Sequence, residues 1–357
     1  MSQTTTVRHG NEFLNALRSN IAKVMVGKDA AVEMLLTALI CGGHVLIEDL
    51  PGLGKTTLAS ALAKSLSCSF KRIQFTPDVL PSDVTGFTAY NLATGEKEIR
   101  FGAVMAQMVL ADEINRTSPK TQSSLLEVMQ ERQVTIDGET YPLPEPFMVL
   151  ATQNPSELTG TYPLPEAQLD RFLLKVSMGY PSREEEYEIL TRRREGVPVS
   201  QLEPVGTAED VLELRRQFAE MKCSSAILNY IVQIAQATRE NDLISLGISP
   251  RGSIALMEAS MARAMLQGRS YVLPDDVKAM TVPVLAHRIR LNLQASMKNR
   301  TAERFSPRLP VRFRCPVSVT KNEAQTRKKA KVPSYDVADD PVRLFDDCIP
   351  DRGSADR

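Results

Sequence analysis

The feature that most constrains this chain is a glycine-rich turn between an apolar stretch and a helical pattern. Residues 44–50 read as a short strand, and apolar residues recur at helical spacing from Lys55 onward. The turn between them holds a proline and two glycines. Glycines lack the Cβ atoms that would keep backbone N–H groups away from a phosphate, and a helix N-terminus adds the positive end of its dipole. The sequence therefore predicts a phosphate-binding loop.

The side chains of this loop suit a nucleotide with its metal ion. Lys55 can reach the β- and γ-phosphates as a point charge, and the Thr56 hydroxyl can take one Mg²⁺ position. The usual spacing begins with a glycine where this chain has Asp49. An ordinary glycine-rich turn that caps a helix is the alternative, and the strand before it argues against that. The predicted loop residues are Asp49, Leu50, Pro51, Gly52, Leu53, Gly54, Lys55, Thr56 and Thr57.

Composition limits the other partners. Lysine plus arginine and aspartate plus glutamate both number 43, and a net charge of zero favours neither nucleic acid nor an anionic membrane as main partner. No apolar run approaches the roughly 18 residues of a membrane span, and residues 1–10 have no apolar signal core. The 5 cysteines are scattered without a C-x-x-C pair, which favours free thiols. We therefore expect a cytoplasmic protein without membrane insertion.

Two further apolar strands end in polar residues. The strand that ends near residue 113 finishes in Asp112 and Glu113, and ligands of open α/β sheets bind at the carboxyl ends of parallel strands. Asp112 would hold Mg²⁺ through water, and Glu113 would polarise the water that attacks the γ-phosphate. The strand at 147–153 is followed by Asn154, which can contact both that water and the γ-phosphate. The alternatives are a solvated strand end for the two acids and a turn residue for Asn154.

The remaining pattern predicts helices and two hairpins around these strands. Helices are expected at 11–25, 30–41 and 119–132, with hairpins at 90–101 around Thr94–Gly95 and at 134–141 around an Asp-Gly turn. Gly27 lies in the turn between the first two helices, and this turn either faces an adenine ring or only joins the helices. The fold class is therefore α/β, a P-loop parallel sheet flanked by helices.

The composition changes after residue 180. A charged helix at 184–194 leads into a proline-containing linker, and four helical stretches follow at 208–221, 226–240, 252–266 and 274–290. They predict a small all-α domain. The expected organisation is a nucleotide-binding core at 1–190, a linker at 191–206, a helical lid at 207–295 and a disordered tail at 296–357. The tail either binds a partner or is an inert extension.

Together these motifs resemble one family, the MoxR group of AAA+ ATPases, in the clade with an insert in its second helix and a hairpin before the first sensor. The likeness runs from about residue 26 to residue 290. The segments that carry it are 43–56, 111–116, 119–122, 151–155, 162–172 and 249–251. The resemblance implies an insert at about 83–101 and a pre-sensor hairpin at about 134–146. A loop with Asp49 in place of the first glycine is also similar to a common form of this family's loop.

The resemblance assigns roles to single residues. It implies that Lys55 and Thr56 belong to the Walker A motif, that Asp112 and Glu113 form the Walker B motif, and that Asn154 is the first sensor. The catalytic set then comprises Glu113, Asn154 and Lys55 in one subunit.

Three arginines complete this expectation. Arg171 resembles the arginine finger that reaches a neighbouring subunit's nucleotide, and Arg251 resembles the second sensor, brought in by the lid. Developing charge on the transferred phosphoryl group needs cations, and a finger is worth roughly 10³ to 10⁵ in rate. Each of the two could instead form a surface salt bridge. Arg116 is a further residue that could contact the neighbour, and the family expectation is a hexamer.

The resulting hypothesis is an ATP- and Mg²⁺-dependent ATPase of the MoxR type. The resemblance implies that it remodels or matures client proteins or complexes with a von Willebrand factor A domain partner. One alternative is a nucleic-acid-stimulated motor, for which Lys97, Arg100 and Arg132 offer few basic residues. The other is a scaffold that uses ATP only to assemble, and Glu113 and Arg171 argue against it.

Overall fold

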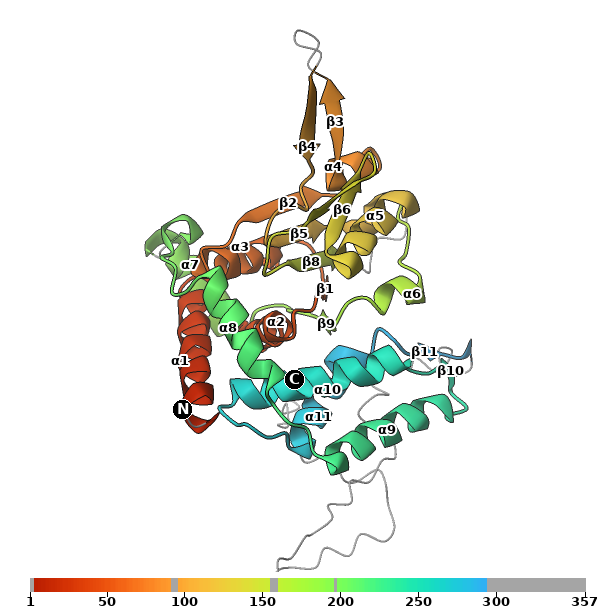
Figure 1. Ribbon diagram of the computed structural model, residues 1–357. Helices are drawn as coiled ribbons and strands as arrows, with labels where there is room; N and C mark the ends of the chain where they lie inside the picture. Colours follow the sequence, from red (N-terminus) through yellow and green to blue (C-terminus); the bar gives the residue numbers. More distant parts are fainter. Residues whose placement is uncertain (1–2, 91–95, 155–159, 196–197, 294–357) are drawn as a thin grey trace, which may run out of the picture. The chain divides into compact units, whose positions relative to one another are not determined.

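Five parallel strands form the central sheet, in the order β2-β5-β8-β1-β9 (Figure 1). Each neighbouring pair in this sheet is parallel, which confirms the predicted sheet type. Val45 and Ile47 of β1 join one hydrophobic cluster while Leu46 joins another, so the sheet is buried on both faces. The strands are β1 (Val45–Glu48), β2 (Phe70–Gln74), β5 (Met108–Asp112), β8 (Met148–Gln153) and β9 (Leu174–Val176).

The computed structural model describes residues 3–90, 96–154, 160–195 and 198–293. All of them belong to one unit, which spans Met1–Arg314. The predicted tail at 296–357, the hairpin tip around Thr94–Gly95 and part of the predicted linker lie outside the described residues. Within the described part of the chain, no helix is both long and apolar enough to cross a membrane.

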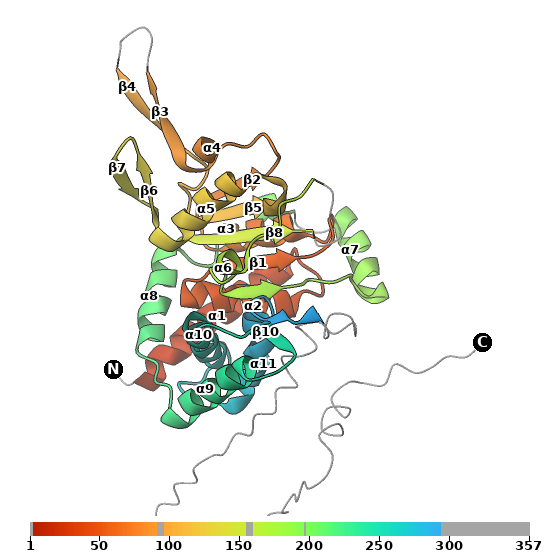
Figure 2. The same ribbon diagram turned by 90° about the vertical axis from the view of Figure 1, so that its right-hand side faces the viewer.

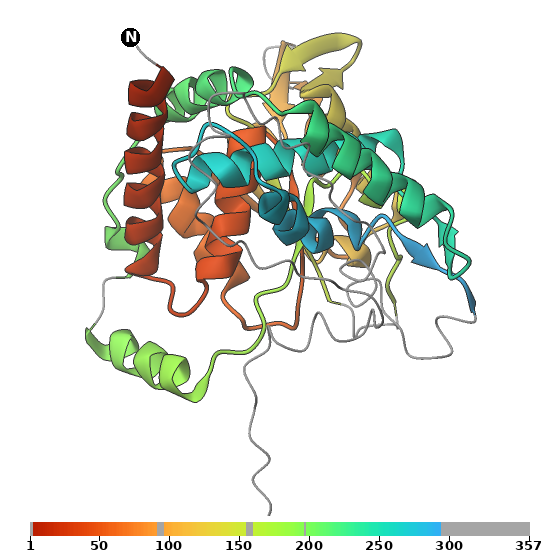
Figure 3. The same cartoon turned by 90° about the horizontal axis from the view of Figure 1, so that it is seen from below.

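Helices cover the two faces of the sheet. The first cluster joins α1, α2 and α3 with α9, α10 and α11, and the second lies under α5. Seen from below, α10 crosses α2, and α1 lies beside α2 (Figure 3). The helices are α1 (Gln3–Ala22), α2 (Asp29–Cys41), α3 (Lys55–Ser65), α4 (Pro81–Thr85), α5 (Pro119–Glu131), α6 (Glu166–Leu169), α7 (Arg183–Glu195), α8 (Ala208–Ala219), α9 (Ser225–Arg239), α10 (Pro250–Leu266) and α11 (Pro274–Leu285), with 3₁₀ turns at Ile114–Arg116 and Val199–Gln201.

Several predicted boundaries were wrong. The first helix begins at Gln3 and ends at Ala22, because its first turns are polar and show no apolar period. The last helix ends at Leu285 rather than near 290, and Pro283 lies in its final turn. An antiparallel pair, β10 (Ile244–Leu246) and β11 (Arg290–Leu291), was not predicted, since such short strands show no alternation.

Two antiparallel hairpins project from one end of the sheet (Figure 2). They are formed by β3 (Gly86–Tyr90) with β4 (Lys97–Phe101), and by β6 (Gln133–Ile136) with β7 (Glu139–Pro142). Asp137 and Gly138 have φ angles of 50° and 85°, which confirms the predicted Asp-Gly turn. The first hairpin begins four residues earlier than predicted, at Gly86 instead of Tyr90. Phe101 and Tyr141 join the two hairpins by an edge contact with ring centroids 5.2 Å apart.

His44 fixes the start of β1 to two other elements. Its Nδ1 accepts a hydrogen bond of 3.0 Å from the Val149 backbone N–H. The proton therefore lies on Nε2, which donates to the Met129 carbonyl at 3.0 Å. Burial lowers the pKa of His44 to about 4, and the Arg132 and Arg215 charges act in the same direction.

This burial predicts an acid-dependent loss of stability. A histidine with pKa 6.5 when unfolded and about 4 when folded stabilises fully above pH 6.5 and loses that contribution as the pH falls toward 4. The loss should reach about 2 kcal/mol at pH 5, at up to about 1.4 kcal/mol per pH unit. Urea unfolding at pH 7.5, 6 and 5 gives the free energy of unfolding of the wild type and of His44→Gln at each pH. The wild type should lose more of this free energy than the variant as the pH falls. An equal loss in both proteins would contradict the assignment.

Candidate nucleotide-binding site

The predicted phosphate loop connects the end of β1 to the start of α3. Gly52 and Gly54 have φ angles of 85° and 89°, a left-handed conformation that favours glycine. A Cβ added at Gly52 would meet no atom within 4 Å, so this part of the loop is open. Lys55, Thr56 and Thr57 form the first turn of α3. The loop therefore has the strand, turn and helix order that the sequence predicted.

Lys55 lies across its own loop. The side chain is buried, and Nζ donates a hydrogen bond of 2.9 Å to the Asp49 carbonyl oxygen. An ammonium group has three donors, so this bond leaves donors that can serve a phosphate. The Asp49 carbonyl thus holds the Lys55 ammonium group beside the loop.

Asp49 anchors the loop to the segment after β9. Its carboxylate accepts hydrogen bonds from the Met178 N–H, the Gly179 N–H at 3.3 Å and the Ser177 hydroxyl at 3.3 Å. Lys28 donates 2.9 Å bonds to the Met178 and Gly179 carbonyls, so the segment is held through both its N–H and C=O groups. Sequence reasoning assigned Asp49 to the nucleotide and missed Lys28, which stands in the turn motif before α2.

The turn that contains Gly27 lies beside the loop. A Cβ added at Gly54 would be 3.5 Å from the Met25 methyl carbon. Gly27 has a φ of 65°, and an added Cβ would lie 2.0 Å from the Glu185 carboxyl group of α7. The positive φ favours glycine at position 27, and a side chain there would displace the Glu185 carboxyl group.

Asp112 ends β5 as a buried carboxylate with three hydrogen bonds. Arg72 of β2 donates to Oδ2 from Nη2 at 2.6 Å and from Nε at 3.1 Å, and Thr152 of β8 donates to Oδ1 at 2.6 Å. The carboxylate of Asp112 and the hydroxyl of Thr56 are hard oxygen donors of the kind that Mg²⁺ prefers, so the predicted metal ligands fit that ion. Sequence reasoning missed Arg72, which stands 40 positions before Asp112 in the chain.

Glu113 follows Asp112 in a strained backbone conformation, with a φ of 58°. Its N–H donates to the Thr152 hydroxyl at 2.8 Å. Its Oε2 accepts from Gln74 at 2.8 Å and lies 3.4 Å from the Arg116 Nε. Neither Gln74 nor the contact of Arg116 within its own chain was predicted.

Asn154 is buried and directly follows β8. Because β8 lies between β1 and β5, Asn154 emerges between the phosphate loop and the acids at the end of β5. Lys55, Asp112, Glu113 and Asn154 thus share the carboxyl edge of the sheet, as the sequence predicted.

Arg171 and Arg251 lie at the opposite, amino-terminal edge. Arg171 precedes β9, and the nearby Leu173 N–H donates to the carbonyl of His44, which precedes β1, at 2.8 Å. Both arginines line one cavity of about 470 Å³. At about 3.3 Å per residue, β1 separates this edge from the phosphate loop by roughly 13 Å. Arg251 therefore lies with Arg171, and not beside the loop of its own chain.

Comparison with known proteins agrees with this geometry. Residues 44–174 match the model of the ATPase family associated with various cellular activities (AAA), and residues 236–308 match the AAA lid domain. The chain is 54% identical to the uncharacterised protein YeaC of Bacillus subtilis, over 80% of this chain and 89% of that one. It is 42% identical to Chaperone MoxR1 of Mycobacterium tuberculosis, over 82% of this chain and 78% of that one.

Two more relatives bear on the family. Protein MoxR of Methylorubrum extorquens is 30% identical over 80% of this chain and 92% of its own length. A crystallised protein from Cytophaga hutchinsonii superposes with a TM-score of 0.79 at 40% identity, covering 84% of this chain and 94% of that one. With its parallel sheet, phosphate loop and AAA lid match, this chain belongs to the MoxR family of AAA+ ATPases.

Proposed function

We propose that this chain hydrolyses ATP at sites shared between adjacent copies of itself and uses the cycle to remodel client proteins. One observation carries the proposal. The predicted nucleotide-binding and acidic residues occupy the carboxyl edge of the sheet, while Arg171 and Arg251 occupy the amino-terminal edge. A chain with this division completes its site only by placing its amino-terminal edge against the carboxyl edge of a neighbour. Closed rotational symmetry then gives a ring, and the family expectation is a hexamer.

In this proposal, ATP binds to the phosphate loop of one protomer. The loop amides and Lys55 grip the phosphates, and Thr56 with Asp112 would hold Mg²⁺, which supplies charge neutralisation when bound. The Asp49 carboxylate keeps the loop against residues 177–179, so its role is to position the backbone that grips the phosphates.

Hydrolysis needs groups from both protomers. Glu113 orients and polarises the attacking water, and Asn154 contacts that water and the γ-phosphate. Gln74 and Arg116 hold the Glu113 carboxylate in the same chain. Arg171 and Arg251 of the adjacent protomer then neutralise the charge that develops on the transferred phosphoryl group. In this proposal Arg251 acts on the neighbour's nucleotide.

The client side of the proposal rests on the relatives. The Mycobacterium tuberculosis relative is named as a chaperone, which supports a remodelling role for this chain. A von Willebrand factor A domain partner is what membership of the family implies. The β3–β4 hairpin offers the exposed aromatic side chains of Phe87, Tyr90 and Phe101 for contact with a protein.

Removal of the loop ammonium should weaken nucleotide binding. Lys55→Ala is expected to weaken ATP binding at least tenfold, because the phosphates lose their cation in the loop. Titration with a fluorescent ATP analogue measures the affinity. Lys64→Ala, at the other end of the same helix, is the matched control and should bind as the wild type does. Equal affinity in Lys55→Ala would remove Lys55 from the site.

Glu113→Gln should separate binding from hydrolysis. The amide keeps the size of the side chain and can still accept from Gln74, but it cannot take up a proton from water. We expect wild-type ATP affinity and a kcat at least 10² lower, the usual size of general base catalysis. Glu127→Gln, an exposed change on α5, should leave kcat intact. Retained turnover in Glu113→Gln would exclude the proposed role.

Two inactive variants should complement each other. Arg171→Ala keeps a complete loop but lends no finger, and Glu113→Gln lends a finger but cannot hydrolyse. Each alone should lose at least 10² in kcat. When their protomers are mixed before ATP is added, sites that pair an intact Glu113 with a neighbour's Arg171 should recover turnover. A mixture no more active than its components would contradict the shared site.

A further inference from the structure

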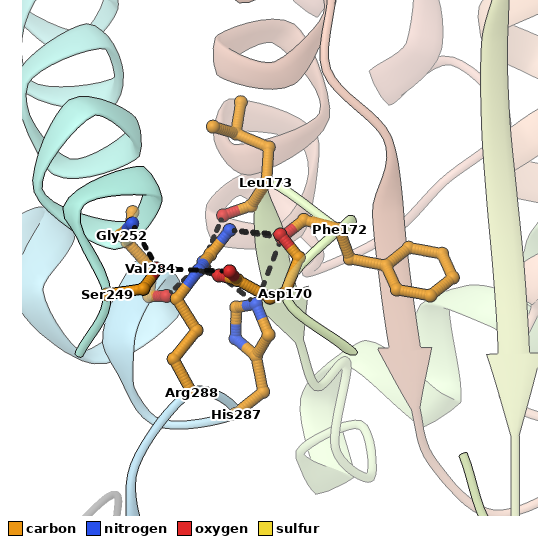
Figure 4. Close-up of polar contacts among 8 residues, drawn as sticks. All are labelled: Asp170, Phe172, Leu173, Ser249, Gly252, Val284, His287 and Arg288. Carbon is orange, nitrogen blue, oxygen red and sulfur yellow. Dashed lines mark hydrogen bonds and ion pairs between the residues drawn. The ribbon is translucent and has the colours of Figure 1, made fainter. Parts of the chain in front are cut away.

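Arg288 grips the backbone on both sides of Arg171 (Figure 4). Its Nη2 donates to the Phe172 carbonyl at 2.6 Å and to the Asp170 carbonyl at 3.3 Å, and its Nη1 donates to the Leu173 carbonyl at 3.1 Å. Its Nε forms an ion pair of 2.7 Å with Asp170 Oδ1. The side chain is only 3% exposed. The segment at 170–173 is therefore fixed while the half-buried Arg171 side chain can face the cavity.

The same carboxylate holds the beginning of α10. Ser249 donates from its hydroxyl to Asp170 Oδ2 at 3.0 Å, and its Oγ accepts the Gly252 N–H at 3.3 Å as the N-cap of this helix. Arg251 stands in the first turn. A Cβ added at Gly252 would lie 3.2 Å from Arg288 Cδ, so the helix start packs closely on the Arg288 stem. Asp170 thus joins the segment of Arg171 to the helix of Arg251.

A guanidinium at this position is costly to bury and specific in its geometry. Burial lowers the pKa of Arg288, and the hydrogen bond and charge of Asp170 oppose that shift. The planar fork of arginine serves several carbonyls and a carboxylate at fixed angles, whereas a lysine ammonium acts as a point charge. A buried cation that only joined two helices would not need hydrogen bonds to the carbonyls of Asp170, Phe172 and Leu173, which flank Arg171 on both sides.

We propose that Arg288, Asp170 and Ser249 form a latch that fixes Arg171 and Arg251 relative to each other, so that a protomer presents both guanidiniums to its neighbour as one unit. The inference rests on the shared site proposed above. Arg288 is a positioning residue, because it acts through the backbone of 170–173 and not on the nucleotide. Opening of the latch would leave the loop of the same protomer intact and impair the site of the adjacent one.

The test measures finger donation alone. Arg171→Ala protomers supply the hydrolysing sites, and donor protomers carry Glu113→Gln with a second change. A displacement of about 1 Å in a catalytic group can cost roughly 10²-fold. We therefore expect Glu113→Gln/Arg288→Lys donors to rescue turnover at least tenfold less than Glu113→Gln donors. Glu113→Gln/Ser249→Ala donors, which lose one contact of the latch, should rescue at least threefold less.

Matched controls remove comparable contacts away from the latch. Arg269 also pairs with a buried carboxylate, at 2.7 Å from Asp276, and Ser224 caps α9 as Ser249 caps α10. Donors that carry Glu113→Gln with Arg269→Lys or Ser224→Ala should rescue fully. Circular dichroism and gel filtration check that each donor is folded and assembled. If Arg288→Lys does not fold, the Ser249→Ala and Ser224→Ala pair decides.

Kinetics distinguish positioning from general destabilisation. Arg288→Lys alone should lower kcat while its KM for ATP stays within twofold of wild type, because its own loop is untouched. Rescue by latch-broken donors equal to that by the control donors would overturn the latch and leave the shared site standing. Absence of rescue by plain Glu113→Gln donors would overturn the shared site, and the latch with it.

Discussion

Parallel pairing of β1 with β8 on one side and β9 on the other determines where each group of the candidate site lies. Because parallel strands end at the same edge, the loop after β1 and Asn154 after β8 emerge together. Arg171 precedes β9 and must lie at the other edge. The division of the site follows from strand direction, so no side-chain rotamer can bring Arg171 to the loop of its own chain.

Buried charged side chains fix the backbone segments on either side of β9. Lys28 and Asp49 hold residues 177–179 through opposite groups of the same peptides, and Arg288 holds the carbonyls of 170–173. In a low-dielectric interior, hydrogen bonds to charged groups are stronger than neutral ones. Lys28 and Arg288 both donate hydrogen bonds to backbone carbonyls. These contacts do not depend on which side chains the bonded residues carry. The backbone that carries Arg171, the candidate finger, is therefore fixed by contacts to its neighbours' main-chain groups.

The sequence predicted the parts of the site that are local in the chain. The loop is a strand, a turn and a helix in succession, and Asp112, Glu113 and Asn154 end recognisable apolar strands. Arg72, Gln74 and Arg288 could not be predicted in the same way, because the acids that they contact (Asp112, Glu113 and Asp170) stand between 39 and 118 positions away and no local period marks them. The same reason explains Arg251: its helix was predicted, but the edge of the sheet that it reaches is set by tertiary packing.

The short strand β9 links the two halves of the site within one protomer. It has three residues, and both of its flanks are fixed by charge: the amino-terminal flank by Arg288 and the carboxyl-terminal flank by Asp49 with Lys28. At about 3.3 Å per residue, the strand spans roughly 10 Å and cannot lengthen without breaking its ladder to β1. Asp49 belongs to the phosphate loop, and Arg288 grips the segment of Arg171. The fold therefore gives the chain a stiff connection between its candidate phosphate loop and the segment of Arg171, which is the geometry that the proposed shared sites would require.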